Sequence, residues 1–428
     1  MQPSNTSDRY TSDFTSMINI VRLNSLGFFF IGFLIPVVAR SNMNASATEI
    51  GFIVSFIVLG HMISDTFIGY LTDRLRSKKT LIFVGSLGRG TSYFIIYFAF
   101  IVNSLLFLGI GTLTLGLMVG FFWVPFDTLI AEKSNKNNRS HAYGKREAAN
   151  ATGQVIGATL GLIILIITSY FTNNPFFLYL AIPIYGIFNF IGGILFLVKV
   201  DETVKFYNKT DSSNNPINEK IINDSKKKRF TRAMLFGLGL LLLVVLLSSI
   251  NGSIAKPFLN IYVLENITSD LYLVILAYLP SGLLATLLAP KLGYFIDKIN
   301  PRVTITFAAL IGAAITWLVI NTTNIWFFMI LIFVDYTIAL SGGLIFRNLV
   351  SRVNIEHRGK IMGFSSFFMN LGATVGPIIG GIVWDAFGAK SPFIVSIFVE
   401  LSLIPLYWLI SYYLLPHLAE TYNRIEKK

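Results

Sequence analysis

The sequence predicts an all-α membrane protein in which twelve transmembrane helices form two bundles of six. Three observations predict this fold: the composition, the number of long apolar stretches and an internal repeat. Hydrophobic residues make up 54% of the 428 residues, charged residues make up 13%, and the mean hydropathy is +0.66. A soluble domain carries about 25% charged residues. Lipid accepts so apolar a chain when helices satisfy its backbone polar groups.

A helix needs about 20 mostly apolar residues to cross a bilayer. Twelve stretches fit this length, at 15–38, 49–71, 80–102, 104–130, 146–170, 176–198, 233–262, 270–292, 303–321, 325–350, 359–383 and 392–415. A long polar stretch separates the sixth from the seventh. We therefore expect an N-terminal six-helix bundle over 1–198, a linker over 199–232 and a C-terminal six-helix bundle over 233–428.

The basic residues predict the orientation. With both termini in the cytoplasm, all but five of the 34 Lys and Arg residues fall on the cytoplasmic side. Arg40, Lys256 and Lys390 lie outside, and Arg22 and Arg89 lie within spans. Membrane proteins concentrate basic residues in cytoplasmic loops, so we expect a multi-pass protein of the cell membrane with a cytoplasmic linker and cytoplasmic termini. This distribution also explains the net charge of +12 without a nucleic-acid partner.

The sequence gives no sign of an enzyme, a cofactor or a metal site. The chain has no Cys, and none of its four His residues belongs to an H-x-x-x-H pair. These facts remove thiolate sites and the usual helical zinc site. The run Gly88-Arg89-Gly90 follows no strand, so it is not a dinucleotide-binding loop.

The two halves of the chain share a pattern. Residues 69–74 read GYLTDR at the end of the second span, and residues 293–298 read GYFIDK at the end of the eighth. Residues 157–161 read GATLG in the fifth span, and residues 372–376 read GATVG in the eleventh. A duplicated six-helix unit of parallel topology predicts two bundles related about the membrane normal.

The segment 69–79, GYLTDRLRSKK, resembles the signature loop of the major facilitator superfamily, G-x-L-x-D-R-x-G-R-K/R. It lacks only the second glycine, where Arg76 stands. With the partial copy after the eighth span, the resemblance covers essentially the whole chain. It implies the twelve-helix fold of that superfamily, alternating access, and a gating motif that contains Gly69, Asp73, Arg74, Gly293 and Asp297.

Within this motif, we expect Gly69 to permit close helix contact. We expect Asp73 to stabilise the start of the eleventh span through its helix dipole and so to lock one conformation. Lys78 and Lys79 are expected only to set the topology.

Two departures bear on the direction of transport. Proton-driven drug antiporters of this superfamily carry an Arg in the fourth span and a G-x-x-x-G-P-x-x-G run in the fifth. The fourth span of this chain has no Arg, and its fifth span has Leu162 where that run has proline. The fuller run stands in the eleventh span, at 372–380. Drug export is therefore only weakly supported by the sequence.

Ionisable groups inside spans need an explanation, because each costs several kcal/mol. His61 and Asp65 lie four residues apart in the second span and share a helix face. Arg89 lies at a similar depth in the third span. One interpretation is a structural ion pair of Asp65 with Arg89, which we predict to lie within about 6 Å of each other. The other is that His61 and Asp65 exchange protons during transport.

Asp335 lies near the middle of the tenth span. Spans one, four, seven and ten line the central cavity in the resembled superfamily, so Asp335 is a candidate to bind a cationic substrate or a proton. The alternative is a structural partner such as Lys256 in the seventh span. Asp127 and Arg22 lie near cytoplasmic helix ends, where long side chains reach water. Glu400, in the peripheral twelfth span, has no explanation in the sequence.

These features predict a monomeric secondary transporter that moves a small organic solute across the bilayer by alternating access, coupled to protons. One alternative is a facilitator without ion coupling. Another is a non-transporting membrane sensor, although the polar linker 199–232 is the only long extension present. The sequence does not identify the solute.

Overall fold

The computed structural model describes residues 9–74, 77–135, 138–172, 174–206, 232–278, 301–352 and 358–414. The chain divides into two compact units, residues 1–213 and residues 214–428. In the described ranges the regular elements are helices, and one isolated antiparallel bridge joins Tyr10 to Ser134. The predicted all-α class is therefore confirmed.

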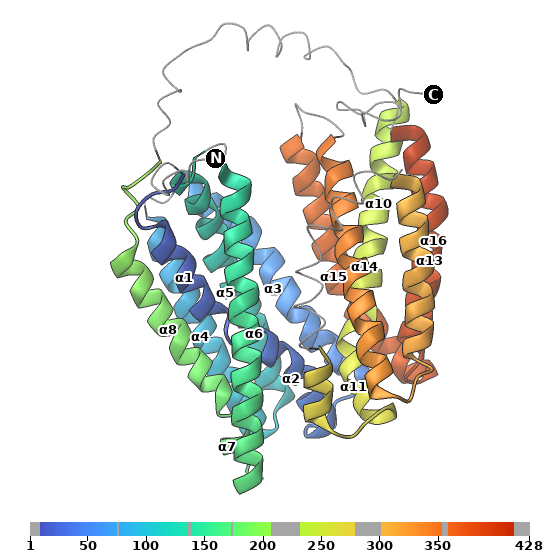
Figure 1. The fold of residues 1–428 in the computed structure, drawn as a ribbon, viewed down its shortest axis with the longest axis horizontal. Helices are drawn as coiled ribbons and strands as arrows, with labels where there is room; N and C mark the ends of the chain where they lie inside the picture. The colour runs from blue at the N-terminus through green and yellow to red at the C-terminus, as the bar shows by residue number, and fades with distance from the viewer. Residues whose placement is uncertain are drawn as a thin grey trace, which may run out of the picture. The chain divides into compact units, whose positions relative to one another are not determined.

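The N-terminal unit is a bundle of nearly parallel and antiparallel helices (Figure 1). Its helices are α1 (Phe14–Ser25), α2 (Phe28–Ser41), α3 (Ala47–Arg74), α4 (Lys78–Val102), α5 (Leu105–Lys133), α6 (Arg139–Phe171), the short α7 (Pro175–Leu178) and α8 (Ala181–Lys199).

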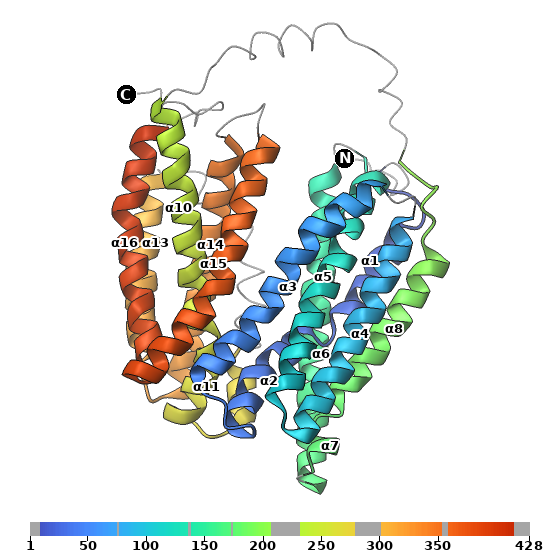
Figure 2. The same ribbon diagram turned by 180° about the vertical axis from the view of Figure 1, so that it is seen from behind.

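The C-terminal unit is a second helical bundle (Figure 2). Its described helices are α10 (Arg232–Ile254), α11 (Lys256–Asn266), α13 (Pro301–Val319), α14 (Ile325–Arg352), α15 (Arg358–Phe387) and α16 (Ser391–Leu414).

Among the described residues, nine helical stretches are long and apolar enough to cross a membrane. Two shorter apolar helices, Ile305–Val319 and Ile325–Ala339, accompany them. The first predicted span differs from a continuous helix, because it breaks into α1 and α2 between Ser25 and Phe28. At the break, a Cβ on Gly27 would lie 2.8–2.9 Å from ring and side-chain atoms of Tyr93 and Tyr185, so the two tyrosines pack directly on the bare backbone.

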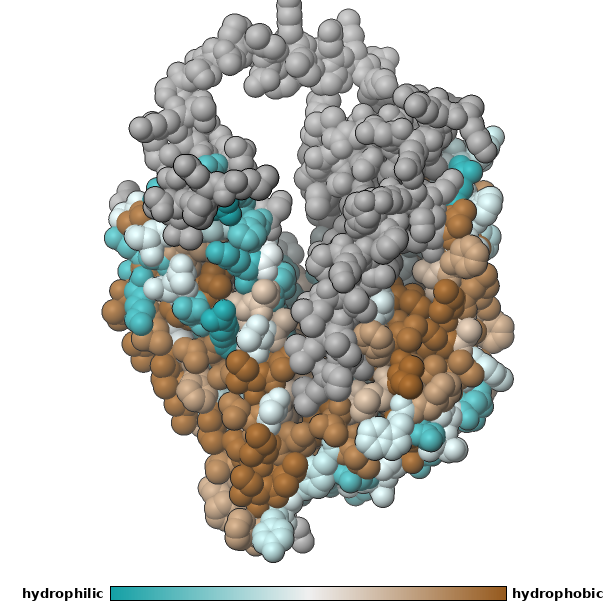
Figure 3. Space-filling model, in the orientation of Figure 1, coloured by the Kyte–Doolittle hydropathy of each residue, from teal (hydrophilic) through white to brown (hydrophobic). Residues whose placement is uncertain are grey.

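The surface of α6 shows why these helices belong in lipid. Large apolar side chains at least two-fifths exposed recur along it at helical spacing: Ile156, Leu160, Ile163, Ile167 and Tyr170. Figure 3 shows this hydrophobic surface on the N-terminal unit, with hydrophilic residues gathered near the upper helix ends. An apolar stripe of this kind would cost free energy in water and costs none against acyl chains.

The repeated glycines occupy equivalent contacts in the two units. A Cβ on Gly157 would collide with the carbonyl oxygen of Leu26, so α6 packs against the break between α1 and α2. A Cβ on Gly372 would lie 2.6 Å from the carbonyl oxygen of Leu246, so α15 packs in the same way against α10. Bare glycine backbone lets membrane helices approach closely, which gives the sequence repeat its physical meaning.

Helix α5 lies between α3 and α4. On one side, a Cβ on Gly60 of α3 would meet the backbone of α5 at Leu113, 2.7 Å away. On the other, a Cβ on Gly85 of α4 would meet the backbone nitrogen of Phe122 at 2.6 Å. Helices that follow one another in the sequence, α3 and α4, are therefore separated by α5, and this order decides which charged side chains can meet.

Candidate functional site

The first group of candidate residues lies on α3. Nε2 of His61 lies 3.1 Å from Oδ1 of Asp65, one helical turn away, and each side chain is about one-third exposed. Asp65 also lies beside α5, because a Cβ on Gly120 would be 3.0 Å from its Oδ1. The predicted pairing of these two residues on one helix face is thus present as a direct contact.

A second polar group lies on α5 and α6. Nε of Arg146 lies 3.2 Å from Oδ1 of Asp127, and its Nη1 lies 2.6 Å from Oε1 of Glu147. The guanidinium carbon lies 4.2 Å from the centre of the Trp123 ring. Helix α5, which carries Asp127, packs directly on α3, which carries Asp65. Acidic groups around an indole suit an aromatic cation, and sequence analysis gave Asp127 no such role.

The predicted ion pair of Asp65 with Arg89 is wrong. Arg89 is 1% exposed, and its Nη2 donates a 2.6 Å hydrogen bond to the carbonyl oxygen of Asn24 on α1. Its guanidinium also lies 5.3 Å from the centre of the Phe122 ring. Helix α5 packs against both α3 and α4 and separates them. Asp65 therefore pairs with His61, while Arg89 faces the interior of the bundle.

In the C-terminal unit, Asp335 lies on α14 and is partly buried. Neither Asp335 nor Lys256 forms an ion pair within the described residues, so the predicted alternative of a structural Asp335–Lys256 partnership is wrong. Lys256 begins α11, and its side chain is exposed.

Glu400 points toward the interior of the C-terminal unit rather than toward lipid. Its carboxylate lies against the backbone of Gly312 on α13. One turn earlier on α16, Ser396 donates a hydrogen bond to the side chain of Asn251 on α10. The sequence offered one signal that went unused, a glycine at position 312 in an otherwise apolar span.

The gating motif is only partly visible. Asp73 and Arg74 close α3, but their side chains lie outside the described part, as do Gly293 and Asp297 altogether. Among the described residues no atom lies within 4 Å of the place a Cβ on Gly69 would take. The close helix contact expected at Gly69 does not occur among the described residues, and it stays a prediction for the rest of the chain.

The two lysines that follow the motif do more than set topology. Nζ of Lys78 lies 2.7 Å from Oε1 of Glu132 at the end of α5. The backbone N–H of Lys79 donates to the carboxylate of Glu202, and its Nζ donates to the carbonyl oxygen of Leu197 at 3.2 Å. The start of α4 is thereby tied to the end of α5, to the end of α8 and to the chain that follows it.

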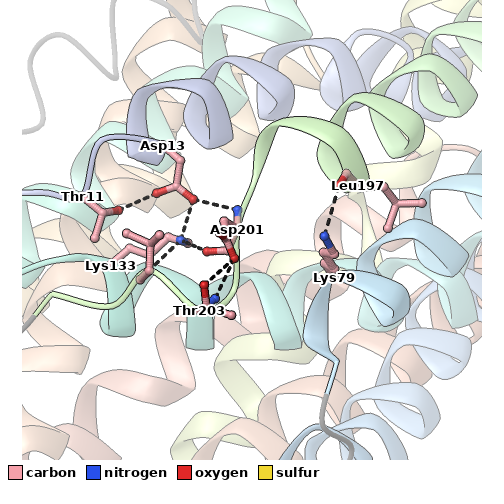
Figure 4. Close-up of polar contacts among 8 residues, drawn as sticks. Thr11, Asp13, Lys79, Lys133, Leu197, Asp201 and Thr203 are labelled. Carbon is pink, nitrogen blue, oxygen red and sulfur yellow. Dashed lines mark hydrogen bonds and ion pairs between the residues drawn. The ribbon is translucent and has the colours of Figure 1, made fainter.

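Sequence analysis missed a buried ion pair at the end of the N-terminal unit where α1 begins (Figure 4). Lys133, 1% exposed, lies 2.6 Å from Oδ2 of Asp13 and donates to the carbonyl oxygens of Asp201 and Val204 at 2.6 and 3.0 Å. Thr11 donates to the other Asp13 oxygen at 2.7 Å. We call Asp13, Lys133 and Asp201 the junction cluster. A lysine at the end of an apolar span gives no sequence signal of such burial.

No group of three or more potential metal ligands occurs among the described residues.

Known proteins resemble this chain over most of its length. The family model of the Major Facilitator Superfamily matches residues 20–353 and 241–424. The chain is 27% identical over 370 residues to Multidrug resistance protein MdtG of Rahnella sp. (strain Y9602), covering 82% of this chain and 81% of that protein. It is 24% identical over 408 residues to Multidrug resistance protein 2 of Bacillus subtilis (strain 168), covering 89% and 92%.

A third relative is Quinolone resistance protein NorA of Staphylococcus aureus (strain MSSA476), 22% identical over 378 residues with 87% and 90% coverage. Among solved structures, an inward-facing bacterial homologue of the human lysosomal transporter Spinster superposes with a TM-score of 0.74 at 13% identity, covering 95% of this chain and 98% of that one. That likeness concerns the fold alone. The family match covers most of the sequence, and the chain therefore belongs to the Major Facilitator Superfamily as a multi-pass transporter of the cell membrane that moves small molecules.

Proposed function

We propose that this transporter exports small amphipathic organic compounds by alternating access, driven by protons that move in the opposite direction. The names of its relatives support the substrate class, since they are multidrug and quinolone resistance proteins. The observation that carries proton coupling is Asp335, a carboxylate within a membrane helix that has no ion-pair partner in the described part of the chain. Such a group is costly unless it meets water, a cation or its own proton.

The acidic groups of the N-terminal unit are proposed to contact substrate. His61, Asp65, Trp123 and Asp127 combine an indole ring with two carboxylates, which favours flat cationic compounds. Arg146 covers the Trp123 ring in this structure, so an aromatic substrate would have to replace it.

We extend the proposal to the topology. Twelve spans form an N-terminal bundle over 1–198 and a C-terminal bundle over 233–428, joined by the linker 199–232, with both termini in the cytoplasm. The distribution of Lys and Arg supports this orientation. Asp73 and Arg74, with Gly293 and Asp297, form the gating motif on the cytoplasmic side, and the protein functions as a monomer.

The test uses the purified full chain in vesicles with a fluorescent quinolone or the cation ethidium as probe. A pH gradient of either sign is imposed, and the Asp335→Asn variant is compared with wild type. We expect the wild type to concentrate the probe only when protons can flow against it, and Asp335→Asn to equilibrate the probe without concentrating it. Equal wild-type rates with and without the gradient would instead establish an uncoupled facilitator and reject the proposal.

A further inference from the structure

Glu400 occupies a site that only glycine on the facing helix can accommodate. The Cβ of any other residue at position 312 would lie 3.0 Å from Cδ and 3.2 Å from Oε2 of Glu400, and closer still to Oε1. The carboxylate therefore lies directly over the Cα of Gly312, between α16 and α13. A side chain that faced lipid would make no such contact.

A polar contact lies one turn before Glu400 on α16. Oγ of Ser396 donates to Oδ1 of Asn251 on α10 at 2.7 Å. Because the amide oxygen of Asn251 accepts from Ser396, its amide N–H group remains a donor for another acceptor near this part of α16.

The charges around Glu400 leave its carboxylate without a cation. Helix α16 packs against α10, α13 and α15, and the groups that face Glu400 from α10 and α13 are Asn251 and Gly312, both uncharged. Arg302 of α13 lies near the ring of Trp408, eight residues or about 12 Å further along α16.

The remaining charged groups nearby do not supply a cation to Glu400 either. On α15, Asp385 stands two residues before the helix ends, well short of the level of Glu400. No ion pair joins Glu400 to a basic side chain within the described residues. An ionised carboxylate in a membrane bundle is costly without a cation or its own proton.

We propose that Glu400 is the second proton-coupling residue of this transporter, in addition to Asp335. Gly312 provides the space for its carboxylate. The step forms one carboxyl O–H bond with a proton from water on one side of the membrane. It breaks that bond to return the proton to water on the other side, while substrate moves the opposite way. This inference rests on the proposed function and adds a residue to it.

The first test separates coupling from substrate movement. Glu400→Gln keeps the size of the side chain and removes its titratable group. In vesicles that contain the full chain, we expect gradient-driven accumulation of ethidium to fall at least tenfold, while exchange of labelled for unlabelled ethidium without a gradient stays within twofold. Unchanged accumulation in Glu400→Gln overturns the inference. A wild type that ignores the pH gradient rejects the proposed function instead, so the two failures are distinguishable.

The second test displaces the carboxylate without removing it. Gly312→Ala pushes Glu400 away from α13, and we expect the pH midpoint of exchange to shift by at least half a unit. Gly239→Ala on α10 is the matched control, because nothing lies within 4 Å of its Cβ position, and it should leave the midpoint in place. Identical pH profiles for the two alanine variants overturn the inference. So does accumulation that follows a sodium gradient rather than a pH gradient, with folding checked by gel filtration in each case.

Discussion

Lys133 at the end of α5 and Asp13 at the start of α1 form an ion pair of 2.6 Å between Nζ and Oδ2 that is almost completely removed from solvent. The same Asp13 oxygen accepts the backbone N–H of Asp201 at 3.0 Å, just after α8 ends. The pair therefore joins the first, fourth and sixth spans of the N-terminal unit at one point, although the three segments are far apart in the sequence.

Removing one partner of this pair should destabilise the N-terminal unit. Lys133→Met leaves the Asp13 charge buried without its partner, and breaking such a pair costs about 3–5 kcal/mol. Thermal unfolding of the purified protein, followed by tryptophan fluorescence, should show a clear drop in midpoint. Lys205→Met is the control, since its pair with Glu132 is longer, at 3.5 Å, and Lys205 is 58% exposed. It should change stability by less than about 1 kcal/mol. Equal effects of the two variants would contradict a dominant role for the buried pair.

The same pair predicts how stability depends on pH. Burial alone would raise the pKa of Asp13, but hydrogen bonds from Lys133, Thr11 and the N–H of Asp201 outweigh it and hold the pKa below its usual value. A lowered pKa in the folded state stabilises the protein at pH above the unfolded value, about 3.9 for Asp. This contribution is lost as the pH falls through the folded value.

The measurement is the difference in unfolding midpoint between wild type and Asp13→Asn across a pH series. The difference should be constant above about pH 5 and should shrink toward pH 3. A difference that grows on acidification would have the wrong sign for this account.

Two glycines of α6, one tightly packed and one open, give a matched pair of variants. Gly157→Ala would place a methyl group on the carbonyl oxygen of Leu26, whereas nothing lies within 4 Å of a Cβ on Gly144 in the same helix. Gly144→Ala should be neutral or slightly stabilising, because alanine favours helix by up to about 1 kcal/mol. Gly157→Ala should reduce the yield of monodisperse protein in gel filtration. Similar yields for the two would mean that α6 can move away from α1 without cost.

The carboxylates of Asp65 and Asp127 in the N-terminal unit should distinguish substrates by charge. Asp65→Asn removes the carboxylate beside His61, and we expect binding of ethidium to weaken roughly five- to tenfold, since one charge contact there is worth about 1 kcal/mol. A neutral compound of similar shape should bind equally well to both proteins. The matched control is Glu147→Gln, whose carboxylate is 61% exposed. Tryptophan quenching measures both affinities, and parallel losses for the cation and the neutral compound would refute a charge-based role.

The class of fold followed from the sequence because burial in lipid imposes length and composition on every span. Side-chain partners were harder to predict. The depth of Asp65 and Arg89 could be counted from their helix ends, but not the fact that α5 lies between α3 and α4. Periodicity gives the direction of a side chain around its own helix and does not say which helix lies there.

Glu400 and Lys133 also have partners that the sequence pattern does not identify. Glu400 looked peripheral because the twelfth span is peripheral. Its partner is Gly312, and a glycine in an apolar span does not by itself indicate which helix packs against it. Lys133 looked like one more basic residue at a helix end. Its burial depends on the chain before α1 and after α8 folding back over it, and no local pattern records that.

The central claim is that substrate and protons move together in opposite directions. The most direct measurement is proton movement caused by substrate alone, in vesicles without a pH gradient that contain a trapped pH-sensitive dye. Adding ethidium to one side of wild-type vesicles should move protons toward that side as ethidium leaves it, and Asp335→Asn should abolish the signal while ethidium still equilibrates. Transport of ethidium by the wild type with no proton movement would contradict the account.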